Sequence, residues 1–129
     1  MAGVIALDAA LLIAHLNAAD AHHQTASDLL EEHADQDLII GPLNLAEALV
    51  AATRSGHLAA TQQAIARLAV REVPFPSDAA TRLAQLRVDT GSKMPDCCVL
   101  LTAEQESASI ATFDERLKKS ASMLGIDTI

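Results

Sequence analysis

Aromatic residues are scarce in this chain of 129 residues, which contains two Phe and neither Trp nor Tyr. Half of the residues are nevertheless apolar. The core must therefore be built from Ala, Leu, Ile and Val, which suit helices packed closely on a parallel sheet that is buried on both faces. A chain of this length is expected to form one domain with one sizeable core, spanning residues 1–129.

Positive charge is also scarce, because 9 Lys and Arg residues stand against 17 Asp and Glu residues, which gives a formal net charge of −8. A non-specific nucleic-acid binder would normally show a net basic face, so this class is disfavoured. An enzyme that gathers acids at a metal site and binds its substrate through a few local cations is still compatible with this charge.

Cysteine occurs only as the adjacent pair Cys97 and Cys98. Neighbouring cysteines rarely bridge each other, and no further Cys or His cluster stands at a zinc-binding spacing. We expect both to be buried as small apolar residues in a reducing cytosol. The N-terminus shows no signal-peptide pattern, and no apolar run reaches the ~18 residues needed to span a bilayer. The sequence therefore predicts a soluble, cytoplasmic protein with no membrane segment.

Short apolar runs alternate with segments of helical periodicity. Strands are predicted at 4–7, 37–40, 109–112 and 125–129, with a possible edge strand at 71–74 because Pro74 limits pairing there. Helices are predicted at 9–17, 22–33, 45–53, 58–68, 77–90, 96–106 and 114–123. Alternation of this kind predicts an α/β fold with a parallel sheet covered on both faces.

Four carboxylates, Asp8, Glu47, Asp96 and Asp114, each follow an apolar segment at an expected helix start. In a parallel sheet these positions gather at one edge. Converging carboxylates repel one another, which raises at least one pKa unless a cation is bound. Oxygen ligands suit Mg²⁺ or Mn²⁺, and no His or Cys cluster offers a site for a softer metal.

Each of these acids also has a structural explanation. Asp8 and Asp114 could be N-caps, and Asn44 with Glu47 has the spacing of a capping box. Asp96 in a first helical turn gains from the helix dipole by ~0.3–1 kcal/mol. Position alone therefore leaves both interpretations open.

Two further residues bear on this choice. Asp78 also opens a helix after a possible strand, yet nothing marks it as catalytic. If the helix that carries Glu47 begins earlier, at Pro42 or Leu43, Glu47 would lie inside the helix and would not be a cap.

Segments 4–13, 45–47, 94–98 and 110–114 resemble the PIN domain, and in particular the VapC-type ribonuclease toxins of bacterial toxin–antitoxin pairs. The resemblance covers essentially the whole chain through four motifs in a fixed order. It implies a three-layer α/β/α sandwich with a five-stranded parallel sheet. It also implies a pocket that holds Mg²⁺ or Mn²⁺ and an activity that cleaves RNA internally.

The resemblance implies roles for particular residues. Asp8, Asp96 and Asp114 would bind the metal, Glu47 would complete the catalytic set directly or through water, and Thr112 would support the site by hydrogen bonding. Ala9 departs from the family, in which Thr or Ser is common after the first acid. A metal-activated water would attack in line and leave a 5′-phosphate and a 3′-hydroxyl.

The RNA would be bound by local cations, of which Lys93 and Arg116 are the first candidates, with Arg54, Arg82 and Arg87 as further ones. Each of these could instead be an ordinary solvated charge.

The adjacent pair His22 and His23 would be compatible with metal or acid–base work, but the structural interpretation is preferred because His22 is expected on the apolar face of its helix. The other histidines, His15, His33 and His57, give no signal.

The resemblance further implies a homodimer and a cognate antitoxin whose C-terminal segment covers the site. Helices 9–17 and 45–53 are rich in Ala and Leu and could supply a groove for that segment. The alternative is that the same faces pack on the sheet.

Other α/β proteins with acids at the sheet edge fit less well. A receiver-like phosphoacceptor domain would have two adjacent acids, but Leu7 and Ala9 flank Asp8. A phosphatase with Asp-x-Asp would have an acid where Ala10 stands. A catalytically silent PIN-like binding module, or another Mg²⁺-binding phosphotransfer domain, stays as the alternative function.

Overall fold

The computed structural model of the protein describes residues 3–129. Helices and strands alternate along these residues, as the apolar patterning predicts. In chain order the elements are β1 (Val4–Leu7), α1 (Ala9–Leu16), α2 (His23–Glu32), β2 (Asp37–Ile40), α3 (Pro42–Arg54), α4 (Leu58–Arg67), β3 (Arg71–Glu72), α5 (Ala79–Thr90), α6 (Met94–Glu106), β4 (Ser109–Ala111) and α7 (Glu115–Met123).

The strands form one parallel sheet in the order β3-β2-β1-β4. β1 lies inside the sheet, where Ala6 pairs with Ile39 of β2 on one side and with Ile110 of β4 on the other. The segment before Pro74 forms only the two-residue edge strand β3, as the proline predicts.

The prediction of five strands is wrong by one. The segment 125–129 contributes an isolated bridge between Thr128 and Ile110, with hydrogen bonds from Ile110 N–H to Asp127 O and from Ile129 N–H to Ile110 O. The reason is the short length of β4. In a parallel strand, the backbone N–H and C=O groups of successive residues point alternately to the two neighbouring strands. Of the three residues of β4, only the middle one, Ile110, therefore presents its groups to the segment 125–129.

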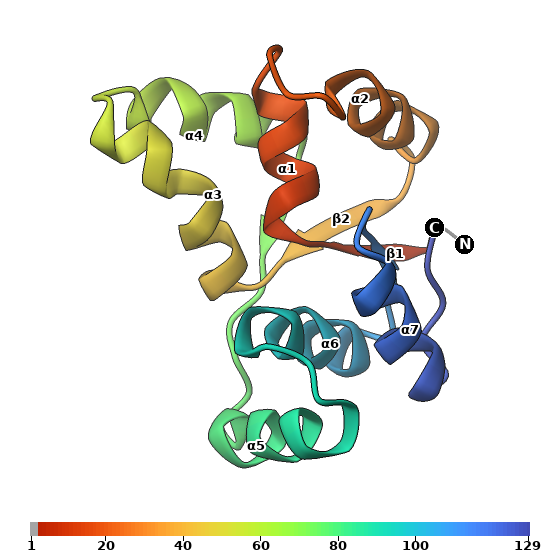
Figure 1. The fold of residues 1–129 in the computed structure, drawn as a ribbon. Helices are drawn as coiled ribbons and strands as arrows, with labels where there is room; N and C mark the ends of the chain where they lie inside the picture. Colours follow the sequence, from red (N-terminus) through yellow and green to blue (C-terminus); the bar gives the residue numbers. More distant parts are fainter. Residues whose placement is uncertain (1–2) are drawn as a thin grey trace.

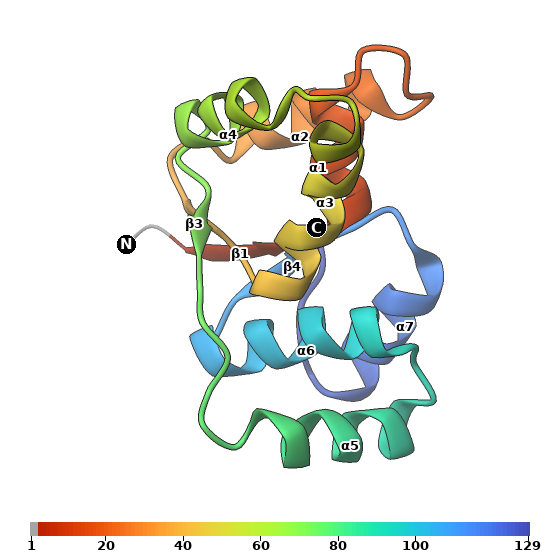
Figure 2. The ribbon, with the colours of Figure 1, turned by 90° about the vertical axis from the view of Figure 1, so that its left-hand side faces the viewer.

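Different helices cover the two faces of the sheet (Figures 1 and 2). Helices α1 to α4 lie on one face and α5 to α7 on the other. The alternation of strand side chains agrees with this arrangement. Ile5 and Leu7 pack in a cluster with residues of α1 to α4, whereas Ala6 packs in a cluster with residues of α5 to α7. The fold is the three-layer α/β/α sandwich that the sequence predicts.

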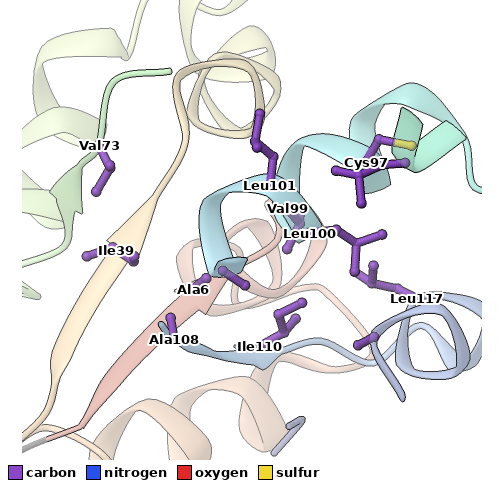
Figure 3. Close-up of a cluster of buried hydrophobic side chains, with 13 residues drawn as sticks. Ala6, Ile39, Val73, Cys97, Val99, Leu100, Leu101, Ala108, Ile110 and Leu117 are labelled. Atoms are coloured by element: carbon purple, nitrogen blue, oxygen red, sulfur yellow. The ribbon is translucent and has the colours of Figure 1, made fainter. Parts of the chain in front are cut away.

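Among the helices α5 to α7, which cover one face of the sheet, α6 is the most deeply buried. Figure 3 shows it lying over the sheet, with Leu100 near Ile110 of β4 and Leu117 of α7, and all three side chains are fully buried. Cys97 and Cys98 lie in this helix as free, buried thiols, which confirms their assignment as small apolar residues.

Two helix starts differ from expectation. Helix α3 begins at Pro42, and Gly41 before it is required by close approach, since a Cβ there would lie 2.8 Å from Thr102 Oγ1 of α6. Helix α2 begins at His23, so His22 lies in the preceding loop and is exposed. The prediction that His22 faces the apolar core is therefore wrong.

Across residues 3–129, every helix is too short or too polar to cross a lipid bilayer.

Candidate active site

The order and connections of the strands indicate one position for a ligand site at the carboxyl edge of the sheet. The connections from β1 to β3 cross the face covered by α1 to α4, whereas the connection from β3 to β4 crosses the other face. The direction of winding therefore reverses between the neighbouring strands β1 and β4. Open parallel sheets bind ligands at such a switch point, outside the carboxyl ends of the strands. Asp8 follows β1, and Thr112 and Asp114 follow β4.

Asp8 is a buried carboxylate, 7% exposed. Its Oδ1 accepts a hydrogen bond of 2.9 Å from the backbone N–H of Leu11, so it caps α1, and its Oδ2 accepts one from the hydroxyl of Thr112. Burial raises the pKa of Asp8, the two hydrogen bonds partly offset this, and the charge of Asp114 raises it again. Capping thus uses one oxygen, and the other faces the end of β4.

Thr112 joins two of the acids. Its hydroxyl donates to Asp8 and accepts a hydrogen bond of 3.0 Å from the backbone N–H of Asp114. Asp114 in turn caps α7, because its Oδ1 accepts from the backbone N–H groups of Arg116 at 2.8 Å and Leu117 at 3.4 Å. The predicted supporting position of Thr112 agrees with these contacts, and Asp114 keeps Oδ2 for another ligand.

Asp96 lies in the first turn of α6, directly after Pro95, and is half-buried. Desolvation is the largest cause that raises its pKa, followed by the charges of Asp114 and Asp8, whereas Lys93 lowers the pKa. Glu47 adds a smaller repulsion of the same sign. Asp96 therefore lies within electrostatic range of the other three predicted acids.

Glu47 is not part of a capping box, and this alternative is wrong. Helix α3 starts at Pro42, so Asn44 and Glu47 both lie inside the helix. The Asn44 side chain is buried, and its Nδ2 donates to Glu47 Oε1 at 3.4 Å and to the carbonyl of Pro95 at 3.1 Å. Asn44 thereby connects the helix of Glu47 to the residue before Asp96. The sequence analysis missed this role because the partner residue is far away along the chain.

The carboxylate oxygens of the four acids are ligands of the kind that a divalent cation such as Mg²⁺ prefers. Burial, and after it the neighbouring negative charges, raises the pKa values of Asp8 and Asp96, and a bound cation would favour their ionised forms. Within residues 3–129, however, no three His, Cys, Asp or Glu side chains are gathered closely enough to enclose an ion. Mg²⁺ commonly uses one or two carboxylates and retains several waters, so this set fits a partly hydrated ion.

A pocket of about 700 Å³ opens beside the acids between α5, α6 and α7. It is lined by Asp96 and Asp114 and by four of the nine basic residues of the chain, Arg87, Lys93, Arg116 and Lys119. Arg87 donates to the carbonyls of Gly91 and Ser92 and so holds the loop before α6. The structure places the two preferred candidates, Lys93 and Arg116, in this pocket. Lys119, which the sequence analysis missed, follows Arg116 by one helical turn, and that spacing was a usable signal.

The other cationic candidates do not line this pocket. Arg82 pairs with Glu104. Arg54 lies in the last turn of α3. Both agree with the alternative of ordinary surface charges.

The PIN domain family pattern matches residues 5–122, which include all four acids, Thr112 and the basic pocket. The chain belongs to the PIN domain family. A search among curated proteins gave no match.

Solved structures share the fold of this PIN domain. VapC20 of Mycobacterium tuberculosis, described as a sarcin-ricin loop cleaving toxin, is 22% identical, with 90% of this chain and 94% of that chain covered and a TM-score of 0.73. VapBC2 of Rickettsia felis, bound to a DNA fragment from its promoter, is 16% identical, with 98% and 97% covered and a TM-score of 0.75. A toxin–antitoxin complex from Klebsiella pneumoniae is 21% identical, with 91% and 89% covered and a TM-score of 0.72.

Proposed function

We propose that this PIN domain is a metal-dependent endoribonuclease and the toxin of a toxin–antitoxin pair. The observation that carries the proposal is the arrangement at the switch point, where Asp96 and Asp114 line a pocket together with four basic residues and Asp8 is hydrogen-bonded to Thr112 beside them. Such a pairing of signs suits a substrate whose backbone is anionic and whose reacting group needs a metal. The structural likeness to toxins, one of them described as a sarcin-ricin loop cleaving toxin, supports the same conclusion.

Asp8, Asp96 and Asp114 would hold Mg²⁺ or Mn²⁺, and Glu47 would act directly or through water. When bound, the ion polarises a phosphate oxygen and lowers the pKa of a bound water. The chain itself supplies position and charge. Thr112 fixes the orientation of Asp8, and the basic side chains of the pocket would hold the phosphates on one side of the cleaved bond.

The basic pocket also answers the difficulty raised by the net charge of −8. RNA binding requires positive potential only along the path of the strand, and clustered cations focus it locally. Lys93, Arg116 and Lys119 would therefore bind substrate phosphates, and binding is expected to weaken steeply with salt.

The test is cleavage of RNA by the purified chain with Mg²⁺ or Mn²⁺ and again with EDTA. Asp8→Asn and Asp96→Asn are expected to abolish cleavage while the fold survives. Asp78→Asn is the matched control, because Asp78 occupies the N-cap position of α5 without a side-chain capping bond and is not among the charges that shift the pKa of Asp8 or Asp96. Full activity of the Asp8 or Asp96 variant would refute the assignment.

The alternatives predict different outcomes in the same assay. A catalytically silent binding module would bind RNA and leave it intact with and without metal. Another Mg²⁺-binding phosphotransfer domain would leave RNA intact and would bind Mg²⁺.

We propose that the antitoxin occupies a second pocket of about 420 Å³ between α1, α3 and α4. Its lining is mainly apolar and includes Ile13, Leu16, Ala48 and Ala51, with Glu47 at its margin. Ile13 is 36% exposed although it is a large apolar residue. An amphipathic helix with a cation placed toward Glu47 would match both the apolar lining and the charge.

Ala51→Arg would fill this groove and is expected to abolish antitoxin binding while cleavage by the free chain persists. Retained antitoxin affinity in this variant would exclude the groove. The homodimer expected from the family is a further proposal, and light scattering of the purified chain tests it.

A further inference from the structure

One of the two phenylalanines lies at the site. Phe113 stands between Thr112 and Asp114, and its ring stacks on the ring of His22, with centroids 5.0 Å apart and planes inclined by 25°. Phe113 is half-buried and packs against the core on the side of α1 to α4. His22 is exposed, so its ring is accessible to solvent while it stacks on Phe113.

The pair is held in a fixed position relative to the acids. The hydroxyl of Thr112 accepts from the backbone N–H of Asp114, which fixes the backbone on both sides of Phe113. The backbone N–H of His22 donates to Asp20 Oδ1 at 2.8 Å. The next residue, His23, donates from Nδ1 to the carbonyl of Ala14 of α1 at 2.9 Å, which anchors the loop.

Asp114 links this ring pair to the basic pocket, because it directly follows Phe113 in the chain and lines that pocket. Phe113 points to the layer of α1 to α4, whereas Lys93, Arg116 and Lys119 line the pocket between α5, α6 and α7 on the other side of the sheet. A strand of RNA that crosses the sheet edge would meet cations on one side of the acids and an aromatic surface on the other.

We propose that the exposed ring of His22, supported by Phe113, stacks one unpaired nucleobase next to the cleaved phosphate. Aromatic and imidazole rings stack bases of single-stranded RNA without requiring a particular sequence. The inference rests on the proposed ribonuclease function and adds to it a substrate class, a strand with an unpaired base at this position.

The experiment measures binding and cleavage separately with a fluorescently labelled single-stranded oligoribonucleotide and with the same strand annealed to its complement. The variants are His22→Ala, His22→Phe and His57→Ala. The last is the matched control, because His57 is also exposed, its ring hydrogen-bonds to the side chain of Ser55, and it does not line the basic pocket beside the acids. Binding is measured by anisotropy in the Asp96→Asn background, in which the strand is not consumed, and thermal unfolding confirms that each variant is folded.

His22→Ala is expected to raise the KM for the single strand and to weaken its binding by about five- to a hundredfold, with kcat little changed. His22→Phe is expected to restore both values, and His57→Ala to leave them unchanged. The duplex is expected to bind weakly to every variant, and substitution of His22 is expected to leave this weak affinity unchanged.

Unchanged KM and affinity in His22→Ala would overturn this inference while leaving the ribonuclease proposal intact. Equal losses in His22→Ala and His22→Phe would also overturn it, because they would indicate a role of the imidazole other than stacking. Absence of metal-dependent cleavage by the unmodified chain would instead refute the proposed function.

Discussion

The hydroxyl of Thr112 offers the sharpest test of how the site is held together. Thr112→Val keeps the shape of the side chain but removes its hydrogen bonds, whereas Thr112→Ser keeps the hydroxyl and removes a methyl group. Thr112 is 2% exposed and Asp8 is 7% exposed, so water replaces neither lost partner fully. The two variants therefore separate hydrogen bonding from packing.

The magnitude follows from the two bonds. The bond to the Asp8 carboxylate is charge-assisted and contributes about 1.5–3 kcal/mol, and the bond from the Asp114 backbone N–H contributes about 0.5–1.5 kcal/mol. Thr112→Val is thus expected to lower the free energy of unfolding by about 2–4 kcal/mol at neutral pH. Thr112→Ser loses about 0.8 kcal/mol for the buried methyl group, plus a small cavity term.

The penalty of the Val variant should depend on pH. The Thr112 hydrogen bond lowers the pKa of Asp8, so the protein with Thr112 gains most over the variant when Asp8 is ionised. The difference between the two is therefore full above the folded pKa of Asp8 and shrinks as the pH falls through it. Urea denaturation of the metal-free proteins at several pH values measures this difference. A Val variant as stable as the parent, with the Ser variant less stable, would refute the reasoning.

Three further predictions concern the metal, Asn44 and the thiols. Burial and like charges raise the pKa values of Asp8 and Asp96 in the folded chain, so their ionisation should destabilise the metal-free fold as the pH rises from the ordinary value of 3.8 through the raised values. Mg²⁺ at a hundred times its dissociation constant should restore about 2.7 kcal/mol at pH 7, and a melting temperature that does not respond to Mg²⁺ would contradict this. Asn44→Leu leaves the Pro95 carbonyl and Glu47 without their hydrogen-bond donor, so it should lower the free energy of unfolding, measured by urea denaturation, by about 1–3 kcal/mol. It should also weaken Mg²⁺ binding, and normal metal affinity in this variant would limit Asn44 to a structural role. Burial raises the pKa of Cys98 to about 11, so Ellman's reagent should titrate this thiol only after unfolding, and rapid labelling of the native chain would show that the site is accessible.

The fold was largely predictable because its signals are local. Apolar runs bounded by Gly, Pro and acids located β1, β2 and β4, and helical periodicity located the helices within a few residues. Errors occurred where a distant contact decides the outcome. Whether residues 125–129 form a strand depends on how many backbone groups β4 leaves free, and that number is set by its pairing with β1.

The residues of the candidate site could be proposed from the sequence, but their arrangement could not. Asp8, Asp114 and Asp78 all stand at helix starts, as local spacing indicated, and that position alone does not separate them. What separates them is electrostatic coupling, which depends on distances across the fold.

The sequence by itself determined the alternation of elements, the apolar core without large rings and the identity of the four acids, because periodicity and residue type are local properties. The tertiary structure alone decided that β4 lies beside β1, which creates the switch point where Asp8 and Thr112 meet. It also decided that Asn44 joins α3 to α6 and that His22 stacks on Phe113. The hydrogen bond of Asn44 joins residues 51 positions apart, and that between Thr112 and Asp8 joins residues 104 positions apart. Residues so distant in the chain come together only when the layers of the fold pack.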